Sequence, residues 1–127
     1  RKLDEYNAAR QHAASVYSAG LQDHPNVTVP KHAEKTNHVF HQYTLKITGK
    51  DRNALQTFLS EKDIPAMIYY PVSLHQQKAY IDERYGDGDF PHTELIQQQV
   101  ISLPMHSELS AEQQDYIIES ILDFLNK

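Results

Sequence analysis

The chain has 127 residues, carries a net charge of −5 with histidine neutral, and contains no cysteine. This length predicts one domain that buries a core without help from disulfides or metals, and the lack of cysteine excludes disulfides, zinc–thiolate centres, iron–sulfur clusters and cysteine nucleophiles in this sequence. Lysines and arginines are scattered, and the longest nearly apolar run (64–72) is too short to span a bilayer, so we expect neither nucleic acid nor a membrane as a partner, and a cytoplasmic location.

The first half of the chain predicts a helix, an irregular connection and a strand. Apolar residues recur at three- and four-residue steps over 1–22, which is typical of one face of an amphipathic helix. The sequence opens at Arg1 inside this pattern, which favours a fragment of a longer protein. Residues 24–37 read as an irregular connection. Residues 39–47 alternate and predict a half-buried strand, whose inward face would carry Val39, His41, Tyr43, Leu45 and Ile47.

The second half predicts three helices and two short strands. Asp51 is placed to cap a helix that ends before Pro65, and 66–70 predicts a strand. Residues 72–89 read as a loop with a helical turn near 76–80. Pro91 opens a helix to about residue 98, and 100–103 predicts a strand. Ser110 and Gln113 have capping-box spacing at the start of a last helix.

This order of elements predicts an α+β fold with two layers. A small antiparallel sheet of about three strands, with helices packed on one face, would bury every apolar face that the pattern defines.

The eight histidines do not predict a metal site. His38 and His41 are three residues apart, and on a strand such positions point to opposite faces. The remaining histidines are dispersed. His41 lies beside Tyr43 on the inward face, where two interpretations stay open: a hydrogen-bonded histidine at the sheet edge, or a residue that faces a ligand.

The segment 67–80 is the best candidate for a binding loop. Tyr69 and Tyr70 end the predicted strand, Pro71 turns the chain, and His75 and Gln77 follow in a loop. Tyrosine rings can stack on a sugar or a base, although aromatic residues at strand ends usually belong to a core. The sequence has no glycine-rich phosphate loop, nucleophile elbow or lysine in a Schiff-base setting.

Three stretches read together resemble the DegT/DnrJ/EryC1/StrS family of sugar aminotransferases. They are 41–47, the phrase Ile-Pro-Ala-Met-Ile-Tyr-Tyr-Pro-Val-Ser-Leu-His-Gln-Gln-Lys-Ala-Tyr at 64–80, and Ile-Ser-Leu-Pro-Met-His-Ser-Glu-Leu at 101–109. Phe90, Pro91 and Glu94 are similar to the short segment that the family places between the last two. The order and spacing agree over nearly the whole chain.

The resemblance implies the fold type I aminotransferase architecture, of which 1–127 would be the C-terminal small domain. Residues 1–22 would be the interdomain helix and 38–127 the α/β body. The N-terminal large domain, with the catalytic lysine that binds pyridoxal 5′-phosphate (PLP), would be absent, so the fragment alone is expected to bind no PLP and to be inactive. The parent would convert a nucleotide-linked keto-sugar to an amino-sugar as a homodimer, with glutamate as the usual donor.

The resemblance also assigns substrate contacts. Tyr69 and Tyr70 match the pair that faces the nucleotide sugar, although many members have histidine in place of Tyr69. His75 and Gln77 match positions that support the loop or approach the substrate, and His41 would lie behind these contacts. No catalytic residue and no metal ligand is expected in this chain. Ser73 and Ser107 replace prolines, which is expected to loosen both turns.

Two other classes of function stay open at this stage. One is a stand-alone α+β module that binds a small molecule or regulates another protein, and the family itself includes regulatory members and some with dehydratase chemistry. The other is a structural role in which the apolar face of the helix over 1–22 docks a partner.

Overall fold

The computed structural model describes residues 2–127 and confirms the α+β class. Four helices and a three-stranded sheet make up the domain. In chain order the elements are α1 (Leu3–Leu21), β1 (Val27–Thr28), β2 (Tyr43–Ile47), α2 (Arg52–Glu61), the 3-10 turns η1 (Leu74–Gln76) and η2 (Lys78–Tyr80), α3 (Pro91–Gln99), β3 (Val100–Leu103) and α4 (Ala111–Leu125).

The sheet is antiparallel, with β2 in the middle and the strand order β1-β2-β3. Val27 lies opposite Ile47, and Tyr43 lies opposite Leu103. Alternation along β2 directs its odd-numbered residues to the core, where they are fully or almost fully buried, while Lys46 on the other face is exposed. One face of the sheet therefore receives the helical layer.

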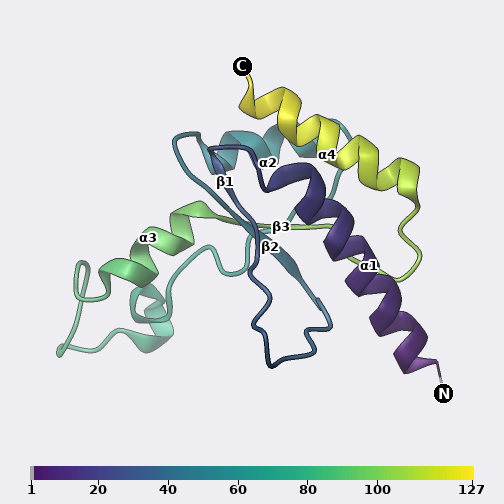
Figure 1. Ribbon diagram of the computed structural model, residues 1–127. Coiled ribbons are helices and arrows are strands. Elements are labelled where there is room, and N and C mark those ends of the chain that lie inside the picture. The colour runs from purple at the N-terminus through teal and green to yellow at the C-terminus, as the bar shows by residue number, and fades with distance from the viewer. Residues whose placement is uncertain (1) are drawn as a thin grey trace.

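Helices α1, α2 and α4 gather on that face, as Figure 1 shows, and α4 packs between the other two. The largest fully buried side chains of the core are Tyr17, Leu21, Tyr43, Leu45, Ile47, Leu55, Leu59, Ile101 and Ile121. Each such aliphatic side chain stabilises the fold by about 1.5–3 kcal/mol through burial. Gly20 lets α1 approach α4 closely, because a Cβ at this position would lie 2.9 Å from the side chain of Ile118.

The helix starts follow the local signals that the sequence predicted. The carboxylate of Asp51 accepts hydrogen bonds from the backbone N–H groups of Asn53 (2.8 Å) and Ala54 (3.1 Å). Ser110 and Gln113 form the reciprocal capping box of α4, and Pro91 occupies the first turn of α3. The predicted positions of these three helix starts are confirmed.

The prediction that a strand runs from residue 39 is wrong, because β2 begins at Tyr43. Phe40 has a φ of +45°, which breaks the extended backbone, and its N–H donates a 2.9 Å hydrogen bond to Nδ1 of His38. Val39 and His41 are exposed and lie outside the sheet. The strand argument that set His38 and His41 on opposite faces is therefore wrong as well. Among residues 2–127 no three histidine, aspartate or glutamate side chains are grouped to hold a metal.

The third strand is also not the predicted one. Residues 66–70 contribute one bridge, in which Met67 and Ser102 exchange two backbone hydrogen bonds of 2.9 and 2.7 Å. The flanking prolines at 65 and 71 have no N–H with which to extend a ladder. The third strand is instead β1, from the segment expected to be irregular, since two residues are too few to show a periodic pattern.

Beyond the sheet, residues 72–99 form a projecting lobe that contains η1, η2 and α3 (Figure 1). The two 3-10 turns confirm the helical turn expected within this loop. In the described chain, none of the helices combines the length and the apolar character needed to cross a lipid bilayer.

Candidate substrate-binding groove

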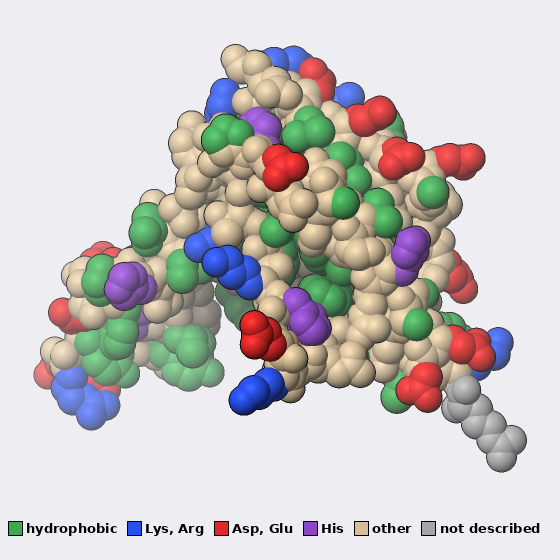
Figure 2. All heavy atoms as spheres, in the orientation of Figure 1, with side chains coloured by type: hydrophobic (Ala, Val, Ile, Leu, Met, Phe, Trp, Pro, Cys, Tyr) green, Lys and Arg blue, Asp and Glu red, His purple; other side chains and the backbone are tan. Residues whose placement is uncertain are grey.

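A groove of about 660 Å³ lies where the lobe meets the sheet. One wall comes from the segment 69–80 and the other from α3 and the start of β3. Its lining residues are Tyr69, Tyr70, Val72, Ser73, Leu74, Gln77, Tyr80, Thr93, Ile96, Gln97 and Val100. Figure 2 shows hydrophobic side chains gathered over the lobe beside this groove. Its volume lies within the range of small-molecule sites in proteins.

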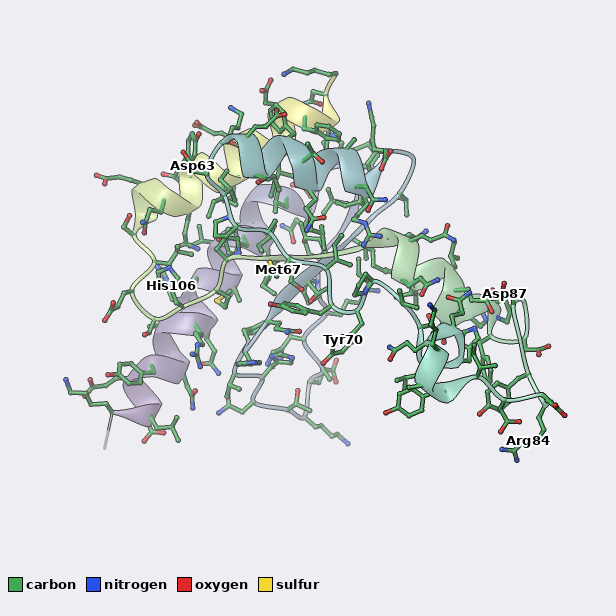
Figure 3. The ribbon with its side chains drawn as sticks, turned by 180° about the vertical axis from the view of Figure 1, so that it is seen from behind. Asp63, Met67, Tyr70, Arg84, Asp87 and His106 are labelled. Carbon is green, nitrogen blue, oxygen red and sulfur yellow. The ribbon has the colours of Figure 1, made fainter. Side chains whose placement is uncertain are left out.

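Tyr69 and Tyr70 stand at the mouth of the groove rather than in the core. Tyr70 is 75% exposed and Tyr69 is 41% exposed, and their rings meet edge to face with centroids 6.2 Å apart. In Figure 3 the labelled Tyr70 points away from the helical layer, between the sheet and the lobe. The core interpretation of these strand-end tyrosines is therefore wrong. Both rings are available to stack on a planar or sugar ligand.

Ser73 and Gln97 join the two walls of the groove. Oε1 of Gln97 accepts hydrogen bonds from both the backbone N–H and the hydroxyl of Ser73, each at 2.6 Å. Ser73 is only 7% exposed. The N–H and the hydroxyl of Ser73 both anchor the turn to α3, and the expectation that serine loosens this turn relative to proline stays a prediction. For Ser107 the same expectation stays a prediction.

His75 lies inside the lobe and does not line the groove. Its side chain is 6% exposed, Nε2 is 3.0 Å from Oε1 of Glu94, and its ring packs against Phe90 with centroids 4.7 Å apart. Glu94 also accepts hydrogen bonds from the backbone N–H groups of Gly88 and Phe90. Glu94 thus connects His75 to the backbone of the loop at Gly88 and Phe90. This geometry gives His75 a position that supports the loop.

Gln77 lines the groove while bracing its own turn. Its Nε2 donates a 3.0 Å hydrogen bond to the carbonyl oxygen of Val72. This bond connects the two ends of the turn over 72–77. The side-chain carbonyl oxygen of Gln77 has no partner among the described residues, and it is free to accept a hydrogen bond from a ligand hydroxyl.

His41 lies beyond Tyr69, away from the groove. It lines a separate hollow of about 240 Å³ together with Met67, Tyr69 and Ser102. Tyr69 contributes to both hollows and so separates His41 from the groove. The structure thus brings Tyr69, Tyr70 and Gln77 together in one groove, with His75 beneath it and His41 behind Tyr69.

The groove has no charged lining residue in the described chain, although the protein as a whole carries a charge of −5. Its chemistry is limited to aromatic stacking, apolar contact and neutral hydrogen bonds. These residues do not fit PLP, because the aldehyde requires an amine to form an aldimine and the phosphate is usually held by cationic or clustered backbone donors. The groove suits an uncharged part of a ligand.

Arg52 supports the groove from behind and was not singled out by its sequence context. It is 7% exposed, and its guanidinium donates to the carbonyl oxygens of Val100 (Nη1, 2.6 Å) and Gln97 (Nη2, 3.0 Å) at the C-terminal end of α3. Burial lowers the pKa of Arg52, and the neighbouring Asp51 acts in the opposite direction. A cation at a helix C-terminus also interacts favourably with the helix dipole.

Comparison with known proteins places this geometry in a family. The model of the DegT/DnrJ/EryC1/StrS aminotransferase family matches residues 1–122. The chain belongs to this family. Two relatives illustrate it: the pleiotropic regulatory protein of Geobacillus stearothermophilus is 38% identical over 96% of this chain, and the dTDP-3-amino-3,6-dideoxy-alpha-D-galactopyranose transaminase of Aneurinibacillus thermoaerophilus is 31% identical over 94%.

Solved structures share the fold of this chain. DesV from Streptomyces venezuelae, solved in complex with a ketimine intermediate, superposes with a TM-score of 0.92 at 29% identity over 99% of this chain. NtdA from Bacillus subtilis, solved with bound cofactor PMP, gives a TM-score of 0.83 at 26% identity over 96%. The chain spans about a third of the length of these relatives: 33%, 31%, 33% and 29% in the order given.

Proposed function

We propose that residues 1–127 form the C-terminal domain of a PLP-dependent aminotransferase that converts the keto group of a nucleotide-linked sugar to an amine, with glutamate as the amino donor. Membership of the DegT/DnrJ/EryC1/StrS family supports the reaction class. The uncharged groove, with Tyr69 and Tyr70 exposed at its mouth, is the main support for a role of this domain in substrate binding. Such a lining suits the sugar or the base of the substrate.

The proposal divides the work between two parts of the parent protein. When bound, PLP accepts the amino group from the donor and passes it to the sugar. The groove of this chain does not fit that cofactor, so we place PLP in the remaining two thirds of the parent. The residues of this chain bind and orient the substrate: the two tyrosines cover one side, Gln77 offers a carbonyl oxygen, and His75 keeps the loop in place.

The remaining features complete the proposal. Helix α1 is proposed as the connection between the two domains, in line with the resemblance, and the parent is proposed to act as a homodimer. Tyr6 and Leu3 are exposed apolar residues on α1, which supports contact with a further domain.

The direct test uses the full-length parent. We expect the parent to form 2-oxoglutarate from glutamate when it is given a nucleotide-linked keto-sugar, and to bind PLP with the absorbance of an aldimine. The 127-residue chain should give no stoichiometric adduct that borohydride traps. A single trapped adduct on this chain, or a parent that binds PLP but turns over no nucleotide keto-sugar, would contradict the proposal.

Regulation is a second candidate, and one observation favours it. The relative at 38% identity is a pleiotropic regulatory protein. A parent that binds a nucleotide sugar and controls gene expression without transamination would support this alternative. The two candidates separate in the parent's assay, because only the aminotransferase forms 2-oxoglutarate at a rate that depends on the keto-sugar.

A further inference from the structure

Gln97 stands near the C-terminal end of α3 and connects that helix to the opposite wall of the groove. Its Oε1 accepts both donors of Ser73, and its Nε2 donates a 2.8 Å hydrogen bond to Oε1 of Gln76. We propose that Gln97 is a positioning residue, which fixes the wall formed by residues 72–77 and so sets the shape of the groove. The consequence for the substrate rests on the proposed function, whereas the positioning itself does not.

The pattern of donors fixes the orientation of the Gln97 amide. Ser73 presents two donors to one atom, so that atom must be the carbonyl oxygen. With the amide reversed, its NH2 group would face the backbone N–H of Ser73, donor against donor. The amide therefore has one orientation that satisfies both Ser73 and Gln76 on the opposite wall.

The anchor on the side of α3 is rigid. The buried Arg52 donates to the backbone carbonyl oxygen of Gln97, which ties the end of α3 to the start of α2. On the other side, Nε2 of Gln76 donates a 2.8 Å hydrogen bond to Asp87. Gln97 therefore stands in a continuous series of hydrogen bonds that runs from the buried Arg52 to the loop at 82–89.

Burial makes the bond to Ser73 matter. Ser73 is nearly buried, so its backbone N–H cannot form a hydrogen bond to water when its acceptor is removed. Loss of this acceptor therefore costs more free energy than loss of an acceptor at an exposed position. The turn that contains Ser73 also supplies three lining residues of the groove, Val72, Leu74 and Gln77. Release of Ser73 would move all three.

Amide hydrogen exchange on the 127-residue chain tests the proposal. Gln97→Met keeps the side-chain length but removes the acceptor, and we expect protection of the Ser73 amide to fall about tenfold or more while Leu45 and Ile101 in the sheet keep theirs. Gln97→Glu keeps an acceptor for Ser73 and should retain most of the protection. Gln98→Met is the matched control, because Gln98 is exposed on the same helix and its side chain makes no hydrogen bond within the described residues.

Each result decides the proposal. Unchanged protection in Gln97→Met, or equal loss in the control, overturns it. If Gln97→Met loses protection throughout the sheet, Gln97→Glu decides: retained Ser73 protection supports positioning by the acceptor, and its loss overturns the proposal. Methionine and glutamate fill similar space at position 97, but only glutamate offers an acceptor. Protection of the Ser73 amide that is kept in Gln97→Glu and lost in Gln97→Met therefore reports the hydrogen bond and not side-chain packing.

A second measurement in the parent separates this proposal from the proposed function. With thymidine diphosphate and uridine diphosphate as probes, Gln97→Met should weaken binding about fivefold or more, and Gln97→Glu less. If neither diphosphate binds the unmodified parent, the proposed function loses its support, while hydrogen exchange still decides the role of Gln97. If a diphosphate binds the parent and both variants equally, the effect of Gln97 on the substrate is contradicted.

Discussion

The hydroxyl of Tyr17 donates a 2.9 Å hydrogen bond to the backbone carbonyl oxygen of Pro104, across 87 residues of sequence. The bond ties the C-terminal part of α1 to the turn that follows β3. The Tyr17 side chain is fully buried, and its ring packs against Tyr43 with centroids 5.2 Å apart. The first helix is thus joined to the sheet layer by a polar contact as well as by apolar packing.

Removal of this hydroxyl should destabilise the domain. Tyr17→Phe leaves the ring in place but leaves the carbonyl oxygen of Pro104 without its partner, and we expect the free energy of unfolding to fall by about 1–3 kcal/mol. Urea denaturation monitored by circular dichroism measures the change. Tyr6→Phe on the exposed face of α1 is the control and should leave stability within about 0.5 kcal/mol of the original. Equal effects in both variants would contradict the role of the Tyr17 hydroxyl.

Alkaline pH should destabilise the fold through Tyr17 and Tyr43. Burial raises the pKa of Tyr17, with a further contribution from the charge of Tyr43, and burial raises the pKa of Tyr43, partly offset by its hydrogen bond to Ser18. Both tyrosines therefore ionise more readily in the unfolded chain. Their contribution is fully present below about pH 10, the pKa of an unfolded tyrosine, and is lost as pH rises through the folded pKa values, by up to about 1.4 kcal/mol per pH unit for each tyrosine.

Urea denaturation at pH 8 to 11 tests this dependence. The unmodified chain should lose stability above about pH 10, and Tyr17→Phe should show a shallower loss, because one of the two protons is no longer released on unfolding. A slope in Tyr17→Phe as steep as in the unmodified chain would show that other groups produce the effect.

Arg52→Met should destabilise the domain and loosen the lobe. The variant leaves the carbonyl oxygens of Gln97 and Val100 without their donor, and we expect a loss of about 2–5 kcal/mol from two unsatisfied acceptors. Thermal unfolding measures the loss. Arg84→Met is the matched control, since Arg84 is exposed and contacts only its near neighbours Asp82 and Tyr85 within the described residues, so its loss should be much smaller. Similar losses in both variants would contradict a supporting role for Arg52.

Tyr70→Phe in the parent should slow the sugar half-reaction and spare the glutamate half-reaction. Because Tyr70 is 75% exposed, the fold should survive the loss of one hydroxyl. One lost hydrogen bond to the substrate costs about 1 kcal/mol, and about 3 if a charged phosphate is the partner, which corresponds to roughly a fivefold to hundredfold slower sugar turnover. Stopped-flow absorbance of the two half-reactions measures the asymmetry.

The control for this variant is Tyr116→Phe on α4, whose hydroxyl lies 3.4 Å from the carbonyl oxygen of Lys62 and away from the groove. It should leave both half-reactions unchanged. Equal slowing of the two half-reactions in Tyr70→Phe would identify Tyr70 as a structural residue rather than a substrate contact.

The sequence by itself determined where α2, α3 and α4 begin. Asp51, Pro91, and the pair Ser110 and Gln113 act on backbone groups within four residues of themselves, so their effect can be read without knowing the rest of the fold. The family motifs also pointed to Tyr69 and Tyr70, which the structure places together at a groove. These signals depend on neighbours in the chain or on a fixed order of motifs.

Tertiary structure alone decided the strand boundaries and the support of the groove. The alternation over 39–47 could not show that Phe40 would take a positive φ, and a two-residue strand such as β1 exists only because β2 pairs with it. Ser73 and Gln97 are 24 residues apart, and Arg52 reaches α3 from 45 residues away. A hydrophobic pattern defines which side of an element is buried but not which polar groups meet there, because those partners are chosen by packing between distant segments.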